Sequence, residues 1–464
     1  MDPVRSKILG ESADSPDANR TSDGMERVLA RDVSKNVGRQ VLVRGWLHKK
    51  RLLGGLTFIN IRDRSGLVQA TVQNKEEVEK LRGLHIGTIL SVTGTVFEEA
   101  RAPGGAELRD PIITIDVPVK DEPPIEIDKP LSHKSENLDT LFDNRVLGLR
   151  NLQEQKIFRV RASLNRYLRE FLTAHEFVEI QTPKLLAGAT EGGAEVFKTD
   201  YFGKEATLAQ SPQFYKQIMV GAFERVFEIG PTFRAEPSAT TRHVAEVTML
   251  DIEMGFIKDH DEVLNMVQDM TYQAITKVYE EHTDDLKSLK APELVLKPQF
   301  PRYTVAEVHH LYSQAHSGGG TDTTNEKDLL PDEERWITEH AKKEHGSEAV
   351  FVTHFPVEAM KFYHLVNPDD PKTVMWADLL FRGLEIATCP MREHHYEKLV
   401  EQIRAAGLDP DHPGYKYYLQ AFKYGLPPHG GCGFGIDRLV EKVVGLNNVK
   451  EAILFPRDIN RLSP

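Results

Sequence analysis

Two arginines, a histidine and two glutamates lie within the fourteen residues 233–246, FRAEPSATTRHVAE. The apolar runs ERVFEIG and VTMLDIEMGF flank them, so the charges connect two segments with the pattern of buried strands. We expect Arg234 just inside the first strand, and a rigid sheet would hold it and Arg242 in place. The fork of a guanidinium group matches the oxygens of a phosphate. The stretch therefore predicts a polyphosphate site, and the alternative is a solvated loop.

A third arginine and three oxygen-bearing side chains follow later in the chain. Arg438 lies in HGGCGFGIDRLVEKVVG, a glycine-rich junction from strand to helix, where glycines allow a ligand to approach closely. Asp378, Glu385 and Thr388 lie in WADLLFRGLEIATCPMRE, with the two acids seven positions apart. On one strand this odd spacing puts the acids on opposite faces, so they converge only if a bend or bulge intervenes. Converging oxygens would suit Mg²⁺ shared with phosphates.

A fourth stretch, ATEGGAEVFKTDYFGKEATLAQSPQFYKQ, carries polar residues at the ends of expected strands. These residues are Glu191, Ser211, Gln213 and Lys216. They could form a pocket for a small zwitterion, and the alternative is that they cap the sheet.

The elements that would position these residues follow from hydrophobic periodicity. LQEQKIFRVRASLNRYLREFLTAHEF, from residue 152, has apolar residues three and four apart and predicts a long amphipathic helix. Later apolar segments (AEVFKTDYF, EATLAQS, RVFEIGPTF and HVAEVTMLDIEMGF) predict an antiparallel sheet. Helical periodicity returns at residues 261–280 and 393–407, whereas 281–301 and 313–335 have the pattern of insertions or loops.

The amino-terminal part has a different organisation. Residues 1–24 are polar and predict a disordered tail. Five short alternating segments between residues 37 and 119, with the helical run NKEEVEKLRG before the fourth, predict a closed barrel of the oligonucleotide-binding kind. The fold class is thus α+β with an all-β amino-terminal domain. We expect a tail over 1–24, a barrel domain over 25–119, a hinge over 120–150 and a large domain with the charged stretches over 151–464.

Bulk composition limits the classes of function. No apolar run reaches the roughly 18 residues that span a bilayer, and the two cysteines, Cys389 and Cys432, predict neither a disulfide framework nor a thiolate zinc site. We therefore expect the reducing environment of the cytoplasm. Net charge is −12, but residues 27–120 hold 16 Lys and Arg against 10 Asp and Glu, which is +6 and leaves −18 for the remainder. A basic module on an acidic body fits contact with a polyanion at one end, but the charge distribution alone favours ordinary surface charge.

These stretches resemble the three signature motifs of class II aminoacyl-tRNA synthetases, which appear in order as FVEIQTPKL, FRAEPSATTRHVAE and GCGFGIDRL. The intervening stretch TEGGAEVF…YFGKEA…AQSPQFYKQ and the end NNVKEAILFPRDINRLSP are similar to aspartyl-tRNA synthetases of the archaeal and eukaryotic type. The resemblance covers about residues 27–464. It implies an ATP-dependent enzyme that forms aspartyl-adenylate and transfers aspartate to the 3′ end of tRNA.

The resemblance also implies a role for each motif residue. Arg234 would hold the α-phosphate and the substrate carboxylate, and Glu236 would read the adenine amino group. Arg242, His243 and Arg438 would bind the β- and γ-phosphates, and Asp378, Glu385 and Thr388 would bind Mg²⁺. Lys216 and Arg392 would grip the side-chain carboxylate of aspartate, and Glu191 and Asp251 would favour its ammonium group. Ser211, Gln213 and His429 match further positions of the aspartate pocket.

In the barrel, the resemblance implies anticodon contacts by Phe58 and Gln69, with Arg51 in the adjoining loop. Phe58 in LTFINI alone would be read as barrel core. The family divides into enzymes strict for aspartate tRNA and enzymes that also charge asparagine tRNA. His48 in GWLH and Pro103 in RAPGG match the relaxed enzymes, whereas the alternative makes His48 an exposed residue with no reading role. Relaxed charging implies a tRNA-dependent amidotransferase as a functional partner, and Pro183 in the first motif implies a homodimer.

The sequence leaves two alternative functions, and at one position it departs from the family pattern. An asparaginyl-tRNA synthetase usually lacks the proline and lysine found here as Pro212 and Lys216. A catalytically silent paralogue would not need the set Arg234, Glu236, Asp378, Glu385 and Arg438. The departure is Val247, where the family usually has an aromatic residue beneath the adenine; Glu246 has no assigned role.

Overall fold

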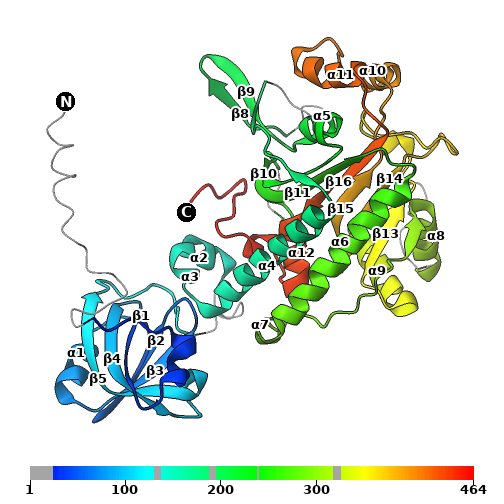
Figure 1. The fold of residues 1–464 in the computed structure, drawn as a ribbon. Helices are drawn as coiled ribbons and strands as arrows, with labels where there is room; N and C mark the ends of the chain where they lie inside the picture. The colour runs from blue at the N-terminus through cyan, green and yellow to red at the C-terminus, as the bar shows by residue number, and fades with distance from the viewer. Residues whose placement is uncertain (1–23, 130–136, 188–194, 238–239, 317–325) are drawn as a thin grey trace. The chain divides into compact units, whose positions relative to one another are not determined.

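The computed structural model describes residues 24–129, 137–187, 195–237, 240–316 and 326–464. The predicted tail over 1–24 and Glu191 lie outside these ranges, apart from Gly24. The chain forms two compact units, Met1–Leu152 and Gln153–Pro464 (Figure 1). No helix in the described ranges is long and apolar enough to cross a membrane.

The first unit contains a closed five-stranded barrel in the order β1-β2-β3-β5-β4, which confirms the predicted oligonucleotide-binding fold. Alternation explains its core: along β4, every second residue from Leu90 to Val96 is buried, so one face of the strand fills the interior. Asn74 starts the predicted helix by accepting hydrogen bonds from Glu76 N and Glu77 N. The strands are β1 (Gln40–Leu53), β2 (Leu56–Arg62), β3 (Leu67–Val72), β4 (Ile89–Glu98) and β5 (Ala106–Val117). The helices are α1 (Lys75–Arg82), α2 (Leu138–Asp143), α3 (Arg145–Gly148) and the 3₁₀ helices at Ala30–Asn36 and Pro103–Gly105.

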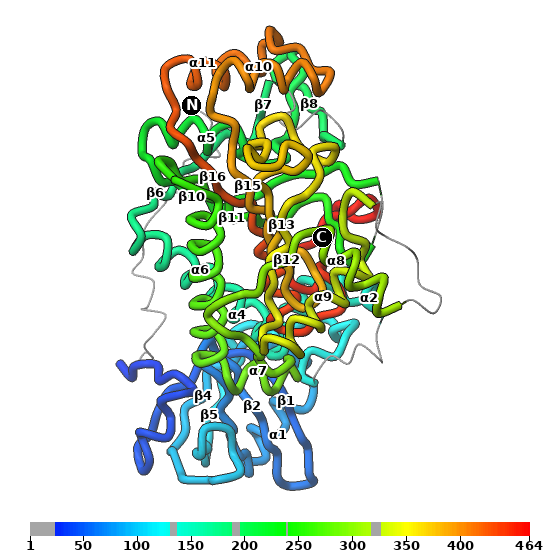
Figure 2. Tube along the Cα trace, turned by 90° about the vertical axis from the view of Figure 1, so that its right-hand side faces the viewer, coloured from blue at the N-terminus to red at the C-terminus, as the bar shows by residue number. Residues whose placement is uncertain are grey.

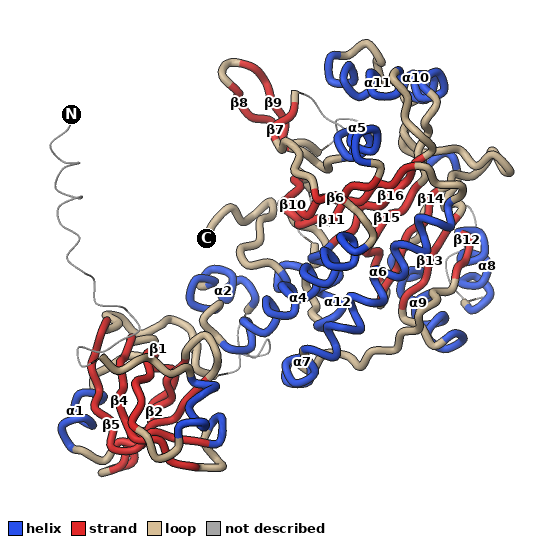
Figure 3. The backbone as a smooth tube through the Cα atoms, viewed as in Figure 1, coloured by secondary structure: helices blue, strands red, loops and turns tan. Residues whose placement is uncertain are grey.

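The second unit is built on a sheet whose described strands follow the order β12-β13-β14-β15-β16-β11-β10-β6 (Figure 3). All neighbouring pairs from β13 to β10 are antiparallel, and the two edge pairs, β12·β13 and β10·β6, are parallel. The strands are β6 (Val178–Glu179), β10 (Arg225–Phe233), β11 (Glu246–Gly255), β12 (Arg302–Thr304), β13 (Ala349–Thr353), β14 (Trp376–Phe381), β15 (Leu384–Pro390) and β16 (His429–Gly435). The antiparallel sheet predicted for this domain is confirmed at its centre.

Two of the predicted strands belong elsewhere. β8 (Lys198–Tyr201) and β9 (Lys204–Leu208) pair with each other and with β7 (Leu185–Leu186) in a separate three-stranded sheet. All four residues of β8 are exposed, and the hairpin buries only Ala206 and Thr207 of β9.

Long helices cover the main sheet and supply its core. α4 (Leu152–Ala174), α6 (His260–Glu281) and α12 (Ile436–Val444) pack apolar side chains such as Leu168, Val267 and Val440 against Ile252 and Phe434 of the strands. The remaining helices are α5 (Gln213–Phe223), α7 (Thr283–Leu289), α8 (Val305–Ala315), α9 (Pro331–His345), α10 (Tyr396–Ala405), α11 (Lys416–Lys423) and 3₁₀ helices at Val357–Ala359, Pro413–Tyr415 and Val449–Ala452. Figure 2 shows α10 and α11 side by side next to α5, where they share an aromatic core.

Two predicted loops contain helices. α7 lies inside 281–301, and α9 begins within 313–335. These segments were wrongly read as loops because α7 is short and polar, and because α9 buries only four of its residues.

Candidate functional site

The charged stretch FRAEPSATTRHVAE connects the antiparallel strands β10 and β11, as predicted. β10 ends at Phe233, so Arg234 lies directly after the strand and not inside it. The pairing continues one step further, because Arg234 N donates to Ala245 O at 2.9 Å. Within the loop, Thr240 Oγ1 accepts from Arg242 N at 3.2 Å and lies 2.7 Å from His243 Nδ1. Contacts of the Thr240 side chain with Arg242 and His243 thus fix the conformation of this part of the loop.

The four chemistry-bearing stretches meet at one cavity of about 280 Å³ in the second unit. Thirteen residues singled out from the sequence line it: Ser211, Gln213, Lys216, Arg234, Glu236, Arg242, His243, Val247, Asp251, Glu385, Thr388, Arg392 and Arg438. Asp378 and His429 are not in the cavity wall and lie in contact with residues close to it. Four arginines thus line the cavity, and Arg234, Arg242 and Arg438 are the three on which the polyphosphate prediction rests.

One end of the cavity holds two buried cations with two buried acids. Lys216 Nζ lies 2.9 Å from Asp251 Oδ1 and 3.6 Å from Glu253 Oε2, and it donates to Cys432 O at 3.0 Å. Arg392 donates to both oxygens of Glu253, at 2.9 and 3.2 Å. Burial opposes ionisation of Glu253, but Arg392 and Lys216 outweigh it and lower the pKa of that carboxyl. Sequence reasoning missed Glu253, although two acids alternating along the apolar strand β11 were a signal.

His429 acts beneath this end through a hydrogen-bonded chain. Its Nδ1 lies 2.8 Å from Pro427 O and its Nε2 lies 2.9 Å from Gln217 Nε2. Because a carbonyl only accepts, Nδ1 carries the proton and Nε2 accepts from the Gln217 amide. Gln217 Oε1 in turn accepts from Gln213 and from Tyr418, at 2.8 and 3.0 Å. Burial lowers the pKa of His429 to about 4, which keeps the ring neutral and this network intact.

The two acids Asp378 and Glu385 lie on neighbouring strands of a hairpin and not on one strand. β14 and β15 are joined by Arg382 and Gly383, both with positive φ (50° and 75°). Asp378 pairs with Thr388, Leu380 pairs with Glu385, and the register shifts between Leu379 and Leu380. The predicted requirement for a bend or bulge is met by both a turn and an irregularity.

Different surroundings separate the two acids electrostatically. Burial raises the pKa of Asp378 well above its usual value, and the neighbouring Glu385 adds to the rise. Burial also opposes ionisation of Glu385, but Arg438 and Thr388 outweigh it and lower the pKa of that carboxyl. Arg438 Nη1 lies 3.0 Å from Glu385 Oε2, and Trp376 Nε1 donates to Asp378 Oδ1 at 2.7 Å. Two carboxylates and a hydroxyl are oxygen ligands of the kind that Mg²⁺ prefers, so this set fits the ion. A bound cation would also favour the ionised form of Asp378, whose pKa is raised without one.

A second cavity, of about 860 Å³, lies on the barrel of the first unit. Arg51, Phe58, Gln69 and Pro103 line it, as expected for members of one binding surface. Thr57 and Ile59 are buried on either side of Phe58, whereas Phe58 is half-buried and faces the cavity. Reading Phe58 as barrel core is therefore wrong.

The floor of the barrel cavity contains a carboxylate that sequence reasoning missed. Glu107 is 4% exposed and accepts from Gln69 Nε2 at 3.0 Å, Thr71 Oγ1 at 2.7 Å and Arg109 Nε at 2.7 Å. Burial opposes ionisation, but these donors outweigh it and lower the pKa of Glu107. Arg109 also lies over the ring of Phe97, 4.7 Å from its centre. The cavity thus combines two aromatic rings with fixed donors and acceptors.

His48 is not among the residues that line this cavity. It lies where the pairing of β1 with β2 shifts register between Leu47 and Lys49, and it is 8% exposed. The alternative is therefore wrong in making His48 exposed, but its statement that His48 has no reading role stays open, because the residue does not line the cavity. Burial lowers the pKa of His48, and Arg62 adds to the effect.

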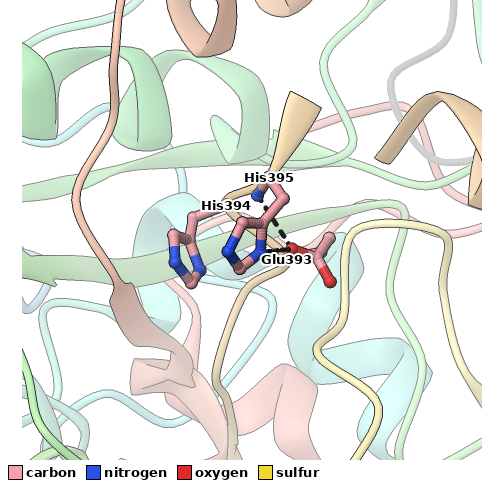
Figure 4. A group of neighbouring side chains, drawn as sticks. All are labelled: Glu393, His394 and His395. Atoms are coloured by element: carbon pink, nitrogen blue, oxygen red, sulfur yellow. Dashed lines mark hydrogen bonds and ion pairs between the residues drawn. The ribbon is translucent and has the colours of Figure 1, made fainter. Parts of the chain in front are cut away.

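Glu393, His394 and His395 bring their possible ligand atoms within 4.8 Å of one another at the start of α10 (Figure 4). Oε1 of Glu393 accepts from His395 N at 2.8 Å and lies 2.7 Å from His395 Nδ1. Because the carboxylate is engaged in this way, we assign the group to fixing the residue that precedes α10. Cys389 and Cys432 are both buried and neither is in a disulfide.

A closed barrel followed by this sheet, with arginines, acids and a glycine-rich third motif around one cavity, defines a class II aminoacyl-tRNA synthetase. The family model for class II tRNA synthetases (D, K and N) matches residues 137–459, and that for the OB-fold nucleic acid binding domain matches residues 41–116. The chain therefore belongs to the class II tRNA synthetases (D, K and N), an enzyme family.

Individual relatives agree with this assignment. The chain is 40% identical to the aspartate–tRNA(Asp/Asn) ligase of Methanopyrus kandleri over 92% of this chain and 96% of the relative. It is 40% identical to the aspartate–tRNA(Asp) ligase of Pyrococcus abyssi over 92% and 97%. Among solved structures, asparaginyl-tRNA synthetase from Pyrococcus horikoshii with asparaginyl-adenylate is similar, with a TM-score of 0.86, 32% identity and coverage of 95% and 100%.

Proposed function

We propose that this protein activates L-aspartate with ATP and transfers the aspartyl group to the 3′ end of tRNA(Asp), and also of tRNA(Asn). The observation that carries the proposal is the polarity of the catalytic cavity. Two charge clusters contribute to its wall: Lys216 and Arg392 contact the buried acids Asp251 and Glu253, and Arg438 contacts Glu385, with Arg242 in the same wall. Two cations favour a substrate with a second carboxylate, and the arginines favour the triphosphate.

The first step follows from these charges. The α-carboxylate of aspartate attacks the α-phosphorus of ATP, the bond to the bridging oxygen breaks, and pyrophosphate leaves with its electron pair. No general base is needed, because a carboxylate is already ionised at neutral pH. Arg234 would stabilise charge that builds at the α-phosphorus, and Glu236 would accept a hydrogen bond from the adenine amino group. The second step breaks the acyl–phosphate bond and releases AMP as the terminal ribose hydroxyl of tRNA takes the acyl group.

Asp378, Glu385 and Thr388 would hold Mg²⁺, which would supply positive charge to the phosphates. Arg242, His243 and Arg438 would orient the β- and γ-phosphates. Asp251 would attract the substrate ammonium group, as would Glu191, which lies outside the described residues. Ser211 and Gln213 would line the aspartate pocket, with His429 fixing Gln213 through Gln217.

For domains, we infer that residues 25–119 bind the anticodon, 120–150 act as a hinge and 151–464 catalyse both steps. Phe58 would stack on a base, and Arg51 and Gln69 would supply polar contacts. We also propose a homodimer, supported by the edge strand β6 within FVEIQTPKL, where Val178 is exposed. The compartment we infer is the cytoplasm.

Aspartate-dependent exchange of pyrophosphate into ATP tests the catalytic proposal. We expect exchange with aspartate and none with asparagine. Exchange with asparagine alone would identify an asparaginyl-tRNA synthetase, which the positions of Pro212 and Lys216 disfavour and the likeness to the Pyrococcus horikoshii enzyme favours. Exchange with neither amino acid would indicate a catalytically silent paralogue.

Relaxed tRNA specificity rests on His48 and Pro103, and relatives of both kinds are equally similar. The test is to offer pure tRNA(Asn) transcript and measure aspartyl product. If tRNA(Asn) is charged at less than one hundredth of the rate on tRNA(Asp), the enzyme is strict for tRNA(Asp). That ratio corresponds to about 2.7 kcal/mol of discrimination. If relaxed charging holds, a tRNA-dependent amidotransferase must convert the product before it reaches the ribosome.

A further inference from the structure

The start of α9 is fixed against its neighbours in the catalytic unit. Glu333 is fully buried and accepts from Leu330 N at 2.9 Å through Oε2. Its other oxygen lies 2.8 Å from Nδ1 of His309 on α8, which is also buried. The first turn of α9 therefore has little freedom, and the position of the next residue, Glu334, is set by the fold.

Glu334 reaches from this turn to an arginine of the ATP end of the cavity. Its Oε2 lies 2.9 Å from Arg242 Nη1, and the two side chains are only 15% and 26% exposed. Burial raises the pKa of Glu334, although Arg242 opposes the rise. Glu385 and Arg438 are the other charged groups that act on this carboxyl, the first raising its pKa and the second lowering it. The ion pair of Glu334 and Arg242 thus belongs to the same charge network as Glu385 and Arg438.

Arg242 is held on a second side by the β14–β15 turn. Its Nη2 donates to Gly383 O at 3.4 Å, and Arg335 of α9 packs against that same glycine. A guanidinium group has five N–H donors, so these two contacts leave three for a ligand. Arg242 also lines the cavity. The side chain is therefore held by Glu334 and Gly383, which do not line the cavity, while Arg242 itself forms part of the cavity wall.

We propose that Glu334 is a positioning residue for the terminal phosphates of ATP, acting by fixing the guanidinium group of Arg242. The proposal rests on the proposed function, because it takes ATP as the ligand. Fixing a donor before the substrate arrives removes the need to order it during binding. A competing arrangement, in which the Glu334 carboxylate blocks Arg242 until ATP displaces it, predicts the opposite sign: removing the charge would tighten ATP binding.

The experiment compares Glu334→Gln with Glu339→Gln in pyrophosphate exchange by the full chain. Glu339 is an exposed residue of the same helix and serves as the matched control. We expect Glu334→Gln to raise the KM for ATP about tenfold through loss of a charge-assisted hydrogen bond. The KM for aspartate should stay unchanged. Binding of a non-hydrolysable sulfamoyl analogue of aspartyl-adenylate should also stay unchanged, because that probe lacks the β- and γ-phosphates.

A double-mutant cycle separates positioning from a general structural effect. In an Arg242→Ala background, Glu334→Gln should have no further effect on the KM for ATP, because its route is through Arg242. An equal loss of analogue binding would show a structural role and overturn the proposal. So would a lowered KM for ATP, or a result equal to that of Glu339→Gln. If the wild-type chain shows no aspartate-dependent exchange at all, the proposed function fails instead.

Discussion

At the scale of single residues, Val247 stands where the resemblance leads us to expect an aromatic ring beneath adenine. It lies directly after Glu246 at the start of β11 and lines the cavity. We predict that Val247→Phe lowers the KM for ATP about threefold to tenfold, because a ring stacked on adenine contributes roughly 0.5–1.5 kcal/mol beyond its area. Pyrophosphate exchange measures the effect.

Val247→Leu is the matched control, since it adds apolar area without a ring. Equal effects of the two substitutions would remove stacking as the cause. A raised KM for ATP in Val247→Phe would mean that the cavity has no room for the ring.

A second residue, His260, makes stability depend on pH. It is 8% exposed, its Nε2 lies 2.7 Å from Cys389 O, and burial lowers its pKa to about 4. Below the ordinary histidine pKa of about 6.5, the unfolded chain gains a proton that the folded chain refuses until about pH 4. Stability is therefore present above pH 6.5 and is lost as pH falls toward 4, by up to about 3 kcal/mol.

We expect His260→Gln to make the loss of stability between pH 6.5 and 4 less steep, because the Gln amide can donate to Cys389 O without titrating; the similar contribution of His429 remains. Urea unfolding at pH 7 and pH 5 measures it. His310→Gln, at an exposed histidine of α8, should leave the pH dependence as in the wild type. An unchanged slope in His260→Gln would contradict the assignment.

The sequence predicts which residues carry the chemistry of the site better than it predicts which side chains contact them. The charged loop, Arg438 and the Lys216 stretch were found because charge inside an apolar pattern is visible in sequence. Glu253 and Glu107 were missed because their roles depend on neighbours that are distant in the chain. Arg392 contacts Glu253 across 139 positions, and Thr71 contacts Glu107 across 36.

At the scale of elements, the β14–β15 turn shows what periodicity could not supply. Reading WADLLFRGLEIATCPMRE as one strand separated Asp378 from Glu385, whereas the Arg382–Gly383 turn brings the strands that carry them side by side. An Arg-Gly pair is a weaker hairpin signal than Asn-Gly, because arginine rarely adopts positive φ. α9 did offer signals that went unused, namely Pro331 at its first position and Gly346 after its end.

We predict that Gly383→Ala destabilises the catalytic unit by more than the cost of positive φ alone. A Cβ there would lie 2.9 Å from Arg335 Cγ and 3.2 Å from Arg335 Cα. Gly407 has the same φ of 75° with nothing within 4 Å, so Gly407→Ala isolates the backbone term, about 1 kcal/mol. Urea unfolding of both variants measures the difference.

The same substitution should raise the KM for ATP, because Gly383 O accepts from Arg242 and α9 must shift away from the new methyl group. Equal stability and equal KM values in the two glycine variants would show that the turn does not support the α9 contact.

At the scale of the whole molecule, two cavities lie in two separate compact units. The +6 charge of residues 27–120 falls on the unit with the barrel. Barrel topology was predictable because alternation and turn residues are local signals. The order of the large sheet was not, since β16 pairs with β11 across more than 170 positions and no local pattern specifies that neighbour.

Because the two cavities lie in separate units, a substitution in the barrel cavity should impair tRNA binding without impairing adenylate formation. Phe58→Ala should raise the KM for tRNA about tenfold to a hundredfold, because stacking of a base on an aromatic ring contributes roughly 1–3 kcal/mol. Aspartate-dependent pyrophosphate exchange should not change, since that reaction needs no tRNA and its cavity lies in the other unit. Aminoacylation and exchange measured on one preparation give both values.

The matched control is Ile112→Ala, which removes an apolar side chain that is 61% exposed on the barrel and is not among the residues lining the barrel cavity. It should leave both reactions unchanged. A loss of exchange in Phe58→Ala would mean that the substitution acts on the fold or that the barrel supports the adenylate step. An unchanged KM for tRNA would instead remove the ring from tRNA binding, and the +6 charge and the match to the OB-fold nucleic acid binding domain would remain as arguments for contact with a polyanion.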